Sequence, residues 1–119
     1  MSKVTTVKEE NTTPIFEGGP TQEQIEQWKS KYGNKIYSIN IDQELFIWKA
    51  LSRKDFKELN AMQDAPLVKE ERLCQICILW PENYDEEAIQ NGLAGAPSIL
   101  AEHIMETSGF GSISAPVAL

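Results

Sequence analysis

Two cysteines and the one histidine are the side chains of this sequence whose types and spacing suggest chemistry. Cys74 and Cys77 lie three residues apart in the stretch RLCQICILWPENYD, residues 72–85. Such a pair can be half of a zinc site, a redox couple, or two small residues packed inside a helix. A structural zinc site needs four ligands, and His103 is the only further ligand of the right type. A redox pair needs a helix N-terminus, where the helix dipole lowers the pKa of the thiol.

The neighbouring residues favour packing for the two cysteines. The run around them is apolar, and we expect a helix over residues 67–80 that ends at Pro81, with the pair in its middle. Residues three apart face the same way on a helix, so both thiols are predicted to point into one interior. We therefore expect no metal and no cofactor. A metal-binding or host-directed regulator that uses Cys74, Cys77 and His103 stays open as an alternative.

The other candidate groups for catalysis lack the arrangement that catalysis needs. Asp85, Glu86 and Glu87 would serve acid–base chemistry only if they were paired with carboxylates in a cleft, and we interpret them as solvated surface. The segment GLAGAPS has two glycines before a helix start but lacks the Lys-Ser/Thr ending of a phosphate-binding loop. No G-x-S-x-G or H-E-x-x-H pattern occurs, and His103 has no nucleophile pattern near it. We therefore predict no catalytic residues and no enzymatic activity.

Composition and charge limit the class of partner. The chain has 119 residues, about one ordinary domain, and its 41% hydrophobic and 24% charged content is that of a soluble globular protein. A net charge of −7 argues against nucleic-acid binding. The last basic residue is Arg72, and six acidic residues follow it, so the C-terminal part presents either a surface for a basic partner or a solvated acidic face. Because no apolar run approaches 18 residues, we predict no membrane span. The N-terminus lacks the apolar middle of a signal peptide. The presence of only two cysteines fits a reducing cytosol.

The pattern of the sequence predicts three segments. Residues 1–19 read as a flexible arm that a partner orders, with Ile15 and Phe16 as its apolar point. Residues 20–110 are expected to form a single domain, and residues 111–119 a loose C-terminal tail.

The expected domain belongs to the α+β class. It begins with a helix capped by Thr21 and ended by Gly33-Asn34, followed by an antiparallel β-hairpin of KIYSINI and LFIWKAL around a DQE turn. Three to four helices then follow. The first is capped by Ser52, and its buried face carries Phe56, Leu59 and Met62. The second is the cysteine helix, and residues 83–96 form a short helix or loop after it. The last helix runs from Pro97 to Gly109, with Leu100 and Ile104 pointing inward.

Aromatic side chains are the largest apolar side chains available for packing or for binding a partner. Most are expected in the core, but Trp48 lies on the strand face opposite Ile47, so one of that pair is expected to point outward as an interface anchor. The predicted partner-binding residues are Ile15, Phe16, Trp28, Tyr32, Trp48 and Phe56.

Residues 21–60, about a third of the chain, resemble small tail-assembly chaperones of tailed bacteriophages. The resemblance rests on the string TQEQIEQWKSKYGNKIYSINID, a hairpin after it, and then LSRKDFKEL. The matching residues are Gln24, Ile25, Trp28, Lys29, Lys31, Tyr32, Gly33, Tyr37, Ile39, Asp42, Arg53 and Lys54. The arm before Thr21 and the C-terminal SGFGSISAPVAL have no counterpart in the pattern.

The resemblance implies a protein without catalysis that acts in the host bacterial cytoplasm. Such chaperones bind the long helical tape-measure protein and keep it soluble while tail-tube subunits polymerise around it. The expected partners are therefore other phage tail or virion proteins, with a homo-oligomer left open. The alternative is a small structural virion subunit of the tail, baseplate or head, anchored to its neighbours by the N-terminal arm.

Overall fold

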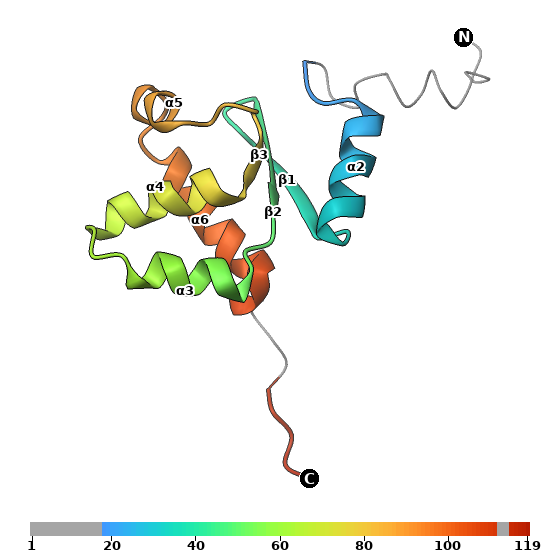
Figure 1. Ribbon diagram of the computed structural model, residues 1–119, viewed down its shortest axis with the longest axis vertical. Coiled ribbons are helices and arrows are strands. Elements are labelled where there is room, and N and C mark those ends of the chain that lie inside the picture. The colour runs from blue at the N-terminus through green and yellow to red at the C-terminus, as the bar shows by residue number, and fades with distance from the viewer. Residues whose placement is uncertain (1–17, 112–114) are drawn as a thin grey trace, which may run out of the picture. The chain divides into compact units, whose positions relative to one another are not determined.

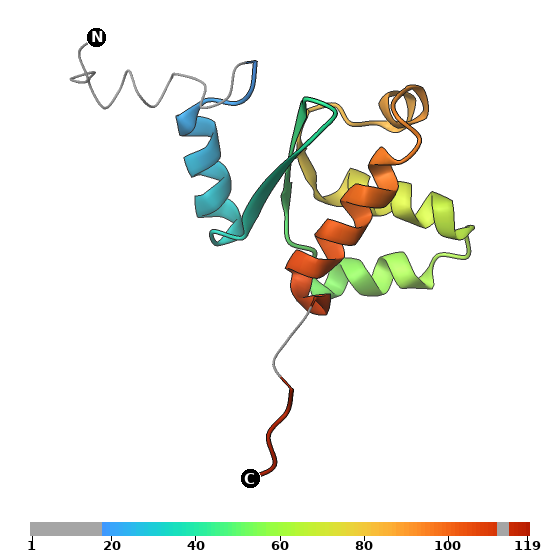
Figure 2. The same cartoon turned by 180° about the vertical axis from the view of Figure 1, so that it is seen from behind.

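A computed structural model describes residues 18–111 and 115–119 of the chain (Figures 1 and 2). Its elements are α2 (Gln22–Tyr32), β1 (Ile36–Ile41), β2 (Glu44–Lys49), α3 (Arg53–Ala61), α4 (Pro66–Cys77), β3 (Ile78–Trp80), α5 (Glu86–Asn91), α6 (Ala96–Met105) and η1, a wide helical turn (Glu106–Phe110). The strands form one antiparallel sheet in the order β1-β2-β3. The predicted α+β class is confirmed. Ile15, Phe16 and nearly all of the expected arm lie outside the described residues.

The chain divides into two compact units. Unit 1 comprises residues up to Lys49 together with Ile78–Asn83, and unit 2 comprises Ala50–Cys77 and Tyr84–Leu119. Unit 1 thus contains α2 and the sheet, and unit 2 contains the remaining helices. The single domain expected over residues 20–110 stays a prediction. The described end of the chain, residues 115–119, is exposed and has no regular secondary structure.

Helix α2 of unit 1 begins and ends where its sequence predicts. The hydroxyl of Thr21 accepts a hydrogen bond of 3.1 Å from the backbone N–H of Gln24, which satisfies one of the free donors of the first turn. Gly33 ends the helix in the left-handed conformation, with φ of 72°, and Asn34 follows at 65°. Lys29 and Lys31 lie in the last turn, where the helix dipole favours positive charge. Both predicted helix boundaries are confirmed.

The predicted hairpin is also present, closed by a two-residue turn. Asp42 and Gln43 both have positive φ, as a type I′ turn requires. The register places Tyr37 opposite Trp48, and their rings stack with centroids 6.1 Å apart. This cross-strand pair adds side-chain packing to the backbone ladder.

A third strand replaces the expected end of the cysteine helix. Helix α4 ends at Cys77, and the next three residues form β3, which pairs antiparallel with β2. The prediction of a helix up to Trp80 is therefore wrong. The physical reason is that Ile78 and Trp80 favour strands and find partners on β2 (Trp48 and Ile47), so that tertiary pairing decides the conformation.

Unit 2 has a helical core. Ser52 caps α3 and Asp85 caps α5, each accepting a hydrogen bond from the backbone N–H three residues later. Pro97 lies in the first turn of α6, as predicted. The buried side chains of α3, α4 and α6 are Leu59, Leu73, Cys74, Cys77, Ala96, Pro97, Leu100, Ala101 and Ile104. Leu100 and Ile104 face inward as expected.

Candidate functional site

The two cysteines lie in the interior of unit 2. Both are reduced cysteines with no exposed surface, as their packing role predicts, although Cys77 is the last residue of α4 and not in the middle of the helix. The thiol of Cys74 donates a hydrogen bond of 3.4 Å to the carbonyl oxygen of Pro97. Burial, followed by the proximity of Cys77, Glu70 and Glu71, raises the pKa of Cys74 from 9.0 to about 12. Reactive cysteines need a lowered thiol pKa, so the raised pKa of Cys74 disfavours a redox role for it.

His103 lies apart from any described group of metal-binding residues. Its Nδ1 is 3.6 Å from Oε1 of Glu106, one turn further along the chain. Within residues 18–111 and 115–119, no three His, Cys, Asp or Glu side chains lie close enough together to hold a metal ion. The described residues therefore bring no ligand set to either cysteine.

The aromatic candidates of unit 1 are covered to different degrees. Trp28 and Tyr32 are half-buried, and the ammonium of Lys49 lies 4.6 Å from the centroid of the Tyr32 ring. Trp48 and Ile47 are only 3% and 2% exposed, so the expectation that one of them points outward is wrong. The reason is that β2 is the central strand of three, so that side chains of both neighbouring strands flank each of its residues on the same face, as Tyr37 and Ile78 flank Trp48. The sequence pattern of a hairpin did not include the third strand.

Phe56 is the one predicted aromatic candidate in unit 2. It is half-buried on α3, and its ring lies 4.9 Å from that of Phe110, centroid to centroid, at the end of η1. The guanidinium of Arg53 lies 5.4 Å from the same ring. Phe110 keeps 51% of its surface exposed, so the pair forms a half-covered apolar edge.

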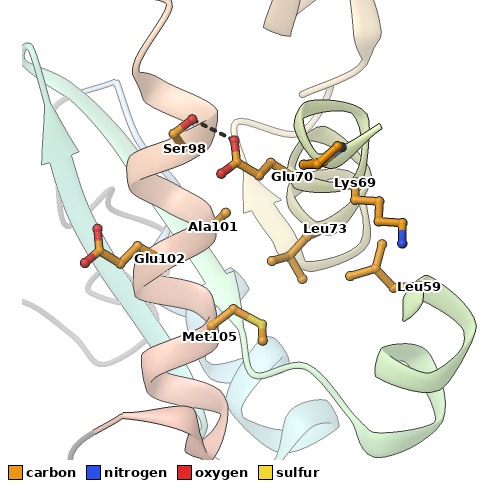
Figure 3. A pocket seen from close by; sticks show the side chains of 9 residues that line it. Leu59, Lys69, Glu70, Leu73, Ser98, Ala101, Glu102 and Met105 are labelled. Carbon is orange, nitrogen blue, oxygen red and sulfur yellow. Dashed lines mark hydrogen bonds between the residues drawn. The ribbon is translucent and has the colours of Figure 1, made fainter. Parts of the chain in front are cut away.

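A groove between three helices opens on the surface of unit 2. It measures about 550 Å³, and we call it the α3–α4–α6 groove. Its lining residues are Leu59, Pro66, Lys69, Glu70, Leu73, Ser98, Ala101, Glu102 and Met105. Figure 3 shows Leu59, Leu73 and Met105 converging from α3, α4 and α6, whereas the carboxylate of Glu102 points to the outer side of α6. The floor of the groove is therefore apolar and its charges lie at the rim.

Hydrogen bonds hold the two longer walls of this groove together. The hydroxyl of Ser98 on α6 donates to Oε1 of Glu70 on α4 at 2.7 Å (Figure 3). Near the same helices, the amide of Gln90 on α5 donates to Oε1 of Glu71 at 3.1 Å. The spacing of α4 and α6 is thus set by side-chain contacts as well as by the core, so the groove is pre-formed.

A second hollow continues the groove along α6. It measures about 480 Å³, shares Glu102 and Met105 with the groove, and is otherwise lined by Glu106, Phe110 and Gly111. We call it the η1 hollow. Together the two hollows form a strip along α6 from Ser98 to Phe110. Its groove part is mainly apolar, whereas its η1 part is lined by the carboxylates of Glu102 and Glu106 as well as by Met105 and Phe110.

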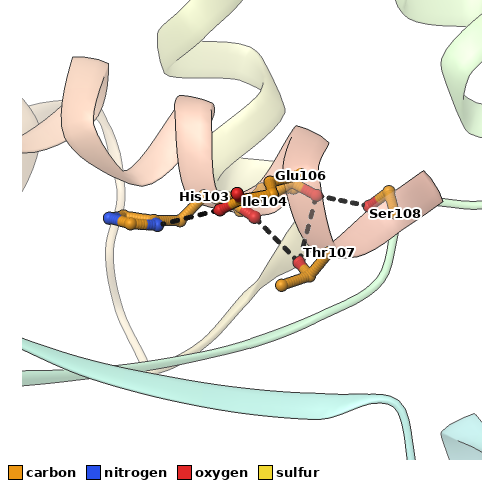
Figure 4. A network of polar contacts seen from close by, with 5 residues as sticks. All are labelled: His103, Ile104, Glu106, Thr107 and Ser108. Atoms are coloured by element: carbon orange, nitrogen blue, oxygen red, sulfur yellow. Dashed lines mark hydrogen bonds and ion pairs between the residues drawn. The ribbon is translucent and has the colours of Figure 1, made fainter. Parts of the chain in front are cut away.

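The wide turn η1 is fixed by hydroxyl groups (Figure 4). The hydroxyl of Ser108 donates to the carbonyl of Ile104 at 2.6 Å and accepts from the backbone N–H of Leu51 at 2.7 Å. Gly109 follows with φ of 103°, which only glycine adopts without strain. A side chain at Gly111 would approach the Cγ of Glu106 to 2.6 Å. These constraints hold Phe110 in place at the end of the strip.

Sequence reasoning found some residues of this site and missed the site itself. Leu59 was expected on a buried face and lines the groove. Phe56, one of the expected partner-binding residues, lines neither hollow but packs on Phe110, which lines the η1 hollow. The meeting of α3, α4 and α6 was not predicted, because it depends on contacts between residues far apart in the chain. One signal was available: on α4, Pro66, Lys69 and Leu73 recur at the spacing of one helix face.

No family model, curated protein or solved structure matches this chain. In the part of the chain that the structure describes, every helix is too short or too polar to cross a bilayer.

Proposed function

We propose that this chain is a non-enzymatic protein of phage tail morphogenesis, of the tail-assembly chaperone type that its sequence resembles, and that it binds an apolar helical stretch of a tail protein such as the tape measure. The α3–α4–α6 groove, continued by the η1 hollow, is the binding surface in this proposal. The site of action is the cytoplasm of the bacterial host.

The observation that carries the proposal is the shape and chemistry of the groove. An amphipathic helix binds to another protein by laying its apolar face into a groove of this kind, with anchors at helical spacing. The floor formed by Leu59, Leu73, Ala101 and Met105 suits such anchors. Small-molecule sites instead combine an apolar pocket with several convergent polar groups. In the described groove the polar atoms of Ser98 and Glu70 bond to each other.

The charge of the chain suits a chaperone. A tape-measure protein exposes apolar helical stripes before the tube covers it, and exposed apolar stripes aggregate. A cover that keeps such a protein soluble gains from high net charge, and this chain carries −7.

The test is co-expression with the tape-measure protein of the same phage. We expect the chain to keep that protein soluble and to purify with it. Met105→Gln, which places an amide in the floor of the groove, is expected to weaken the complex about tenfold, as loss of one anchor does. Leu93→Gln is the matched control, because Leu93 is an exposed apolar residue outside the groove. Equal loss in both variants, or none in Met105→Gln, contradicts the use of the groove.

Mass spectrometry of purified virions separates the chaperone from a structural subunit. A chaperone acts during assembly and is expected to be absent from finished particles. A fixed number of copies per virion would instead support the subunit anchored by its arm.

A further inference from the structure

The charges beside the α3–α4–α6 groove are distributed unevenly between its walls. On the α6 side, Glu102 and Glu106 are four residues apart and both exposed, and they therefore lie on the same helix face. On the α4 side, Lys69 lines the groove. The other acidic lining residue, Glu70, accepts the hydroxyl of Ser98.

The acidic pair formed by Glu102 on α6 and Glu106 at the start of η1 has little compensating positive charge in the C-terminal part of the chain. From Leu73 to Leu119 the sequence contains no Lys or Arg. Glu106 lies 3.6 Å from His103, and Glu102 forms no ion pair with another described residue. Two like charges at this spacing destabilise a helix slightly. External cations placed beside them would relieve that repulsion.

We propose that the groove selects a helix by the charges on its two flanks, an inference that rests on the function proposed above. The occupant is an amphipathic helix lying along α6. It carries Lys or Arg four residues apart on the flank that faces Glu102 and Glu106, and an acidic residue on the flank that faces Lys69. The strip from Ser98 to Phe110 spans about 18 Å at the rise of a helix, which is roughly three turns of the occupant.

A second copy of this chain is a poor occupant for the same surface. Each copy of this chain carries a net charge of −7, and a net charge this far from zero opposes the association of two copies through any surface. Like charges across an interface oppose binding. The acidic flank thus favours a different, basic partner.

The experiment uses the full chain and synthetic helical peptides of about 16 residues, roughly four turns. Three peptides share one leucine stripe. The first has lysines on one flank and glutamates on the other, the second has glutamates on both flanks, and the third has glutamine on both flanks. Fluorescence anisotropy gives their dissociation constants at about 20 mM and about 0.5 M salt, where screening differs strongly.

We expect the first peptide to bind about tenfold more tightly than the second at low salt, since exposed ion pairs each contribute modestly and several act together. The difference is expected to shrink at high salt. Glu102→Lys combined with Glu106→Lys is expected to reverse the preference. Glu86→Lys combined with Glu87→Lys is the matched control, because it changes the net charge equally on α5, where neither residue lines the groove. That control is expected to keep the preference.

The remaining outcomes overturn the inference and are distinguishable from each other. If all three peptides bind equally and Met105→Gln abolishes their binding, the groove binds helices as proposed but does not select them by charge. Loss of the preference in both double variants would assign it to net charge alone. Binding of no peptide, together with a dimer in sedimentation that Met105→Gln dissociates, would assign the groove to a second copy.

Discussion

At the residue scale, the thiol of Cys74 couples the stability of the chain to pH. Its pKa is raised from 9.0 to about 12 in the folded chain, so the folded chain keeps a proton that the unfolded chain loses between these values. The stabilisation is fully present below pH 9.0 and is lost as the pH rises toward 12. We expect the free energy of unfolding, measured by urea titration, to fall more steeply above pH 9.0 in the wild type than in Cys74→Ala.

Cys74→Ala is the appropriate comparison because it keeps every other group that titrates in alkali. The substitution also removes a buried sulfur atom, and we expect it to cost about 1–3 kcal/mol at neutral pH. Parallel pH profiles of the two proteins would show that this thiol ionises equally in the folded and unfolded chain.

At the element scale, the hairpin turn is strained in a way that substitution can relieve. Gln43 has φ of 67°, a conformation that costs a side-chain-bearing residue about 1 kcal/mol or more and glycine almost nothing. We therefore expect Gln43→Gly to raise the free energy of unfolding by roughly 0.5–1 kcal/mol, the gain being reduced by the greater freedom of glycine in the unfolded chain. Gln43→Ala, which keeps the Cβ atom, is expected to bring no gain. Urea unfolding of the wild type and the two variants measures these differences. A lower free energy of unfolding in Gln43→Gly than in the wild type would contradict strain at this turn.

The elements that sequence could predict are those with local signals at their ends. Thr21 and Ser52 supply capping hydroxyls, Gly33 supplies a left-handed end, and the short polar turn joins two runs of β-formers. Strand β3 has no such signal at its start. Apolar residues run without a break from α4 into β3, so only the partners on β2 show where the helix gives way to a strand.

The candidate site was harder to predict because it has no motif. Its floor combines Leu59, Leu73 and Met105 from three helices that are separated along the chain. Each looks like an ordinary core residue when read alone. Conversely, Trp48 is of a residue type common among interface anchors but is buried, because Tyr37 and Ile78 on the two neighbouring strands flank it on its own face. The site follows from tertiary packing, which local patterns do not record.

At the scale of the whole molecule, the chain path interleaves the two compact units. Strand β3 belongs to unit 1, yet the segments on either side of it, ending at Cys77 and resuming at Tyr84, belong to unit 2. Strand β3 is therefore joined at both of its ends to segments of unit 2. Two units linked in this manner are expected to unfold together, as small single domains usually do.

The positions of the tryptophans allow this coupling to be measured. Trp28, Trp48 and Trp80 all lie in unit 1, whereas most helical residues lie in unit 2. We expect tryptophan fluorescence and the circular dichroism of the helices to report the same thermal midpoint. Leu79→Pro, which removes a backbone donor from the middle of β3, is expected to lower both midpoints by the same amount. Separate midpoints in the wild type, or a shift of the fluorescence midpoint alone in Leu79→Pro, would show that unit 2 folds without the strand it encloses.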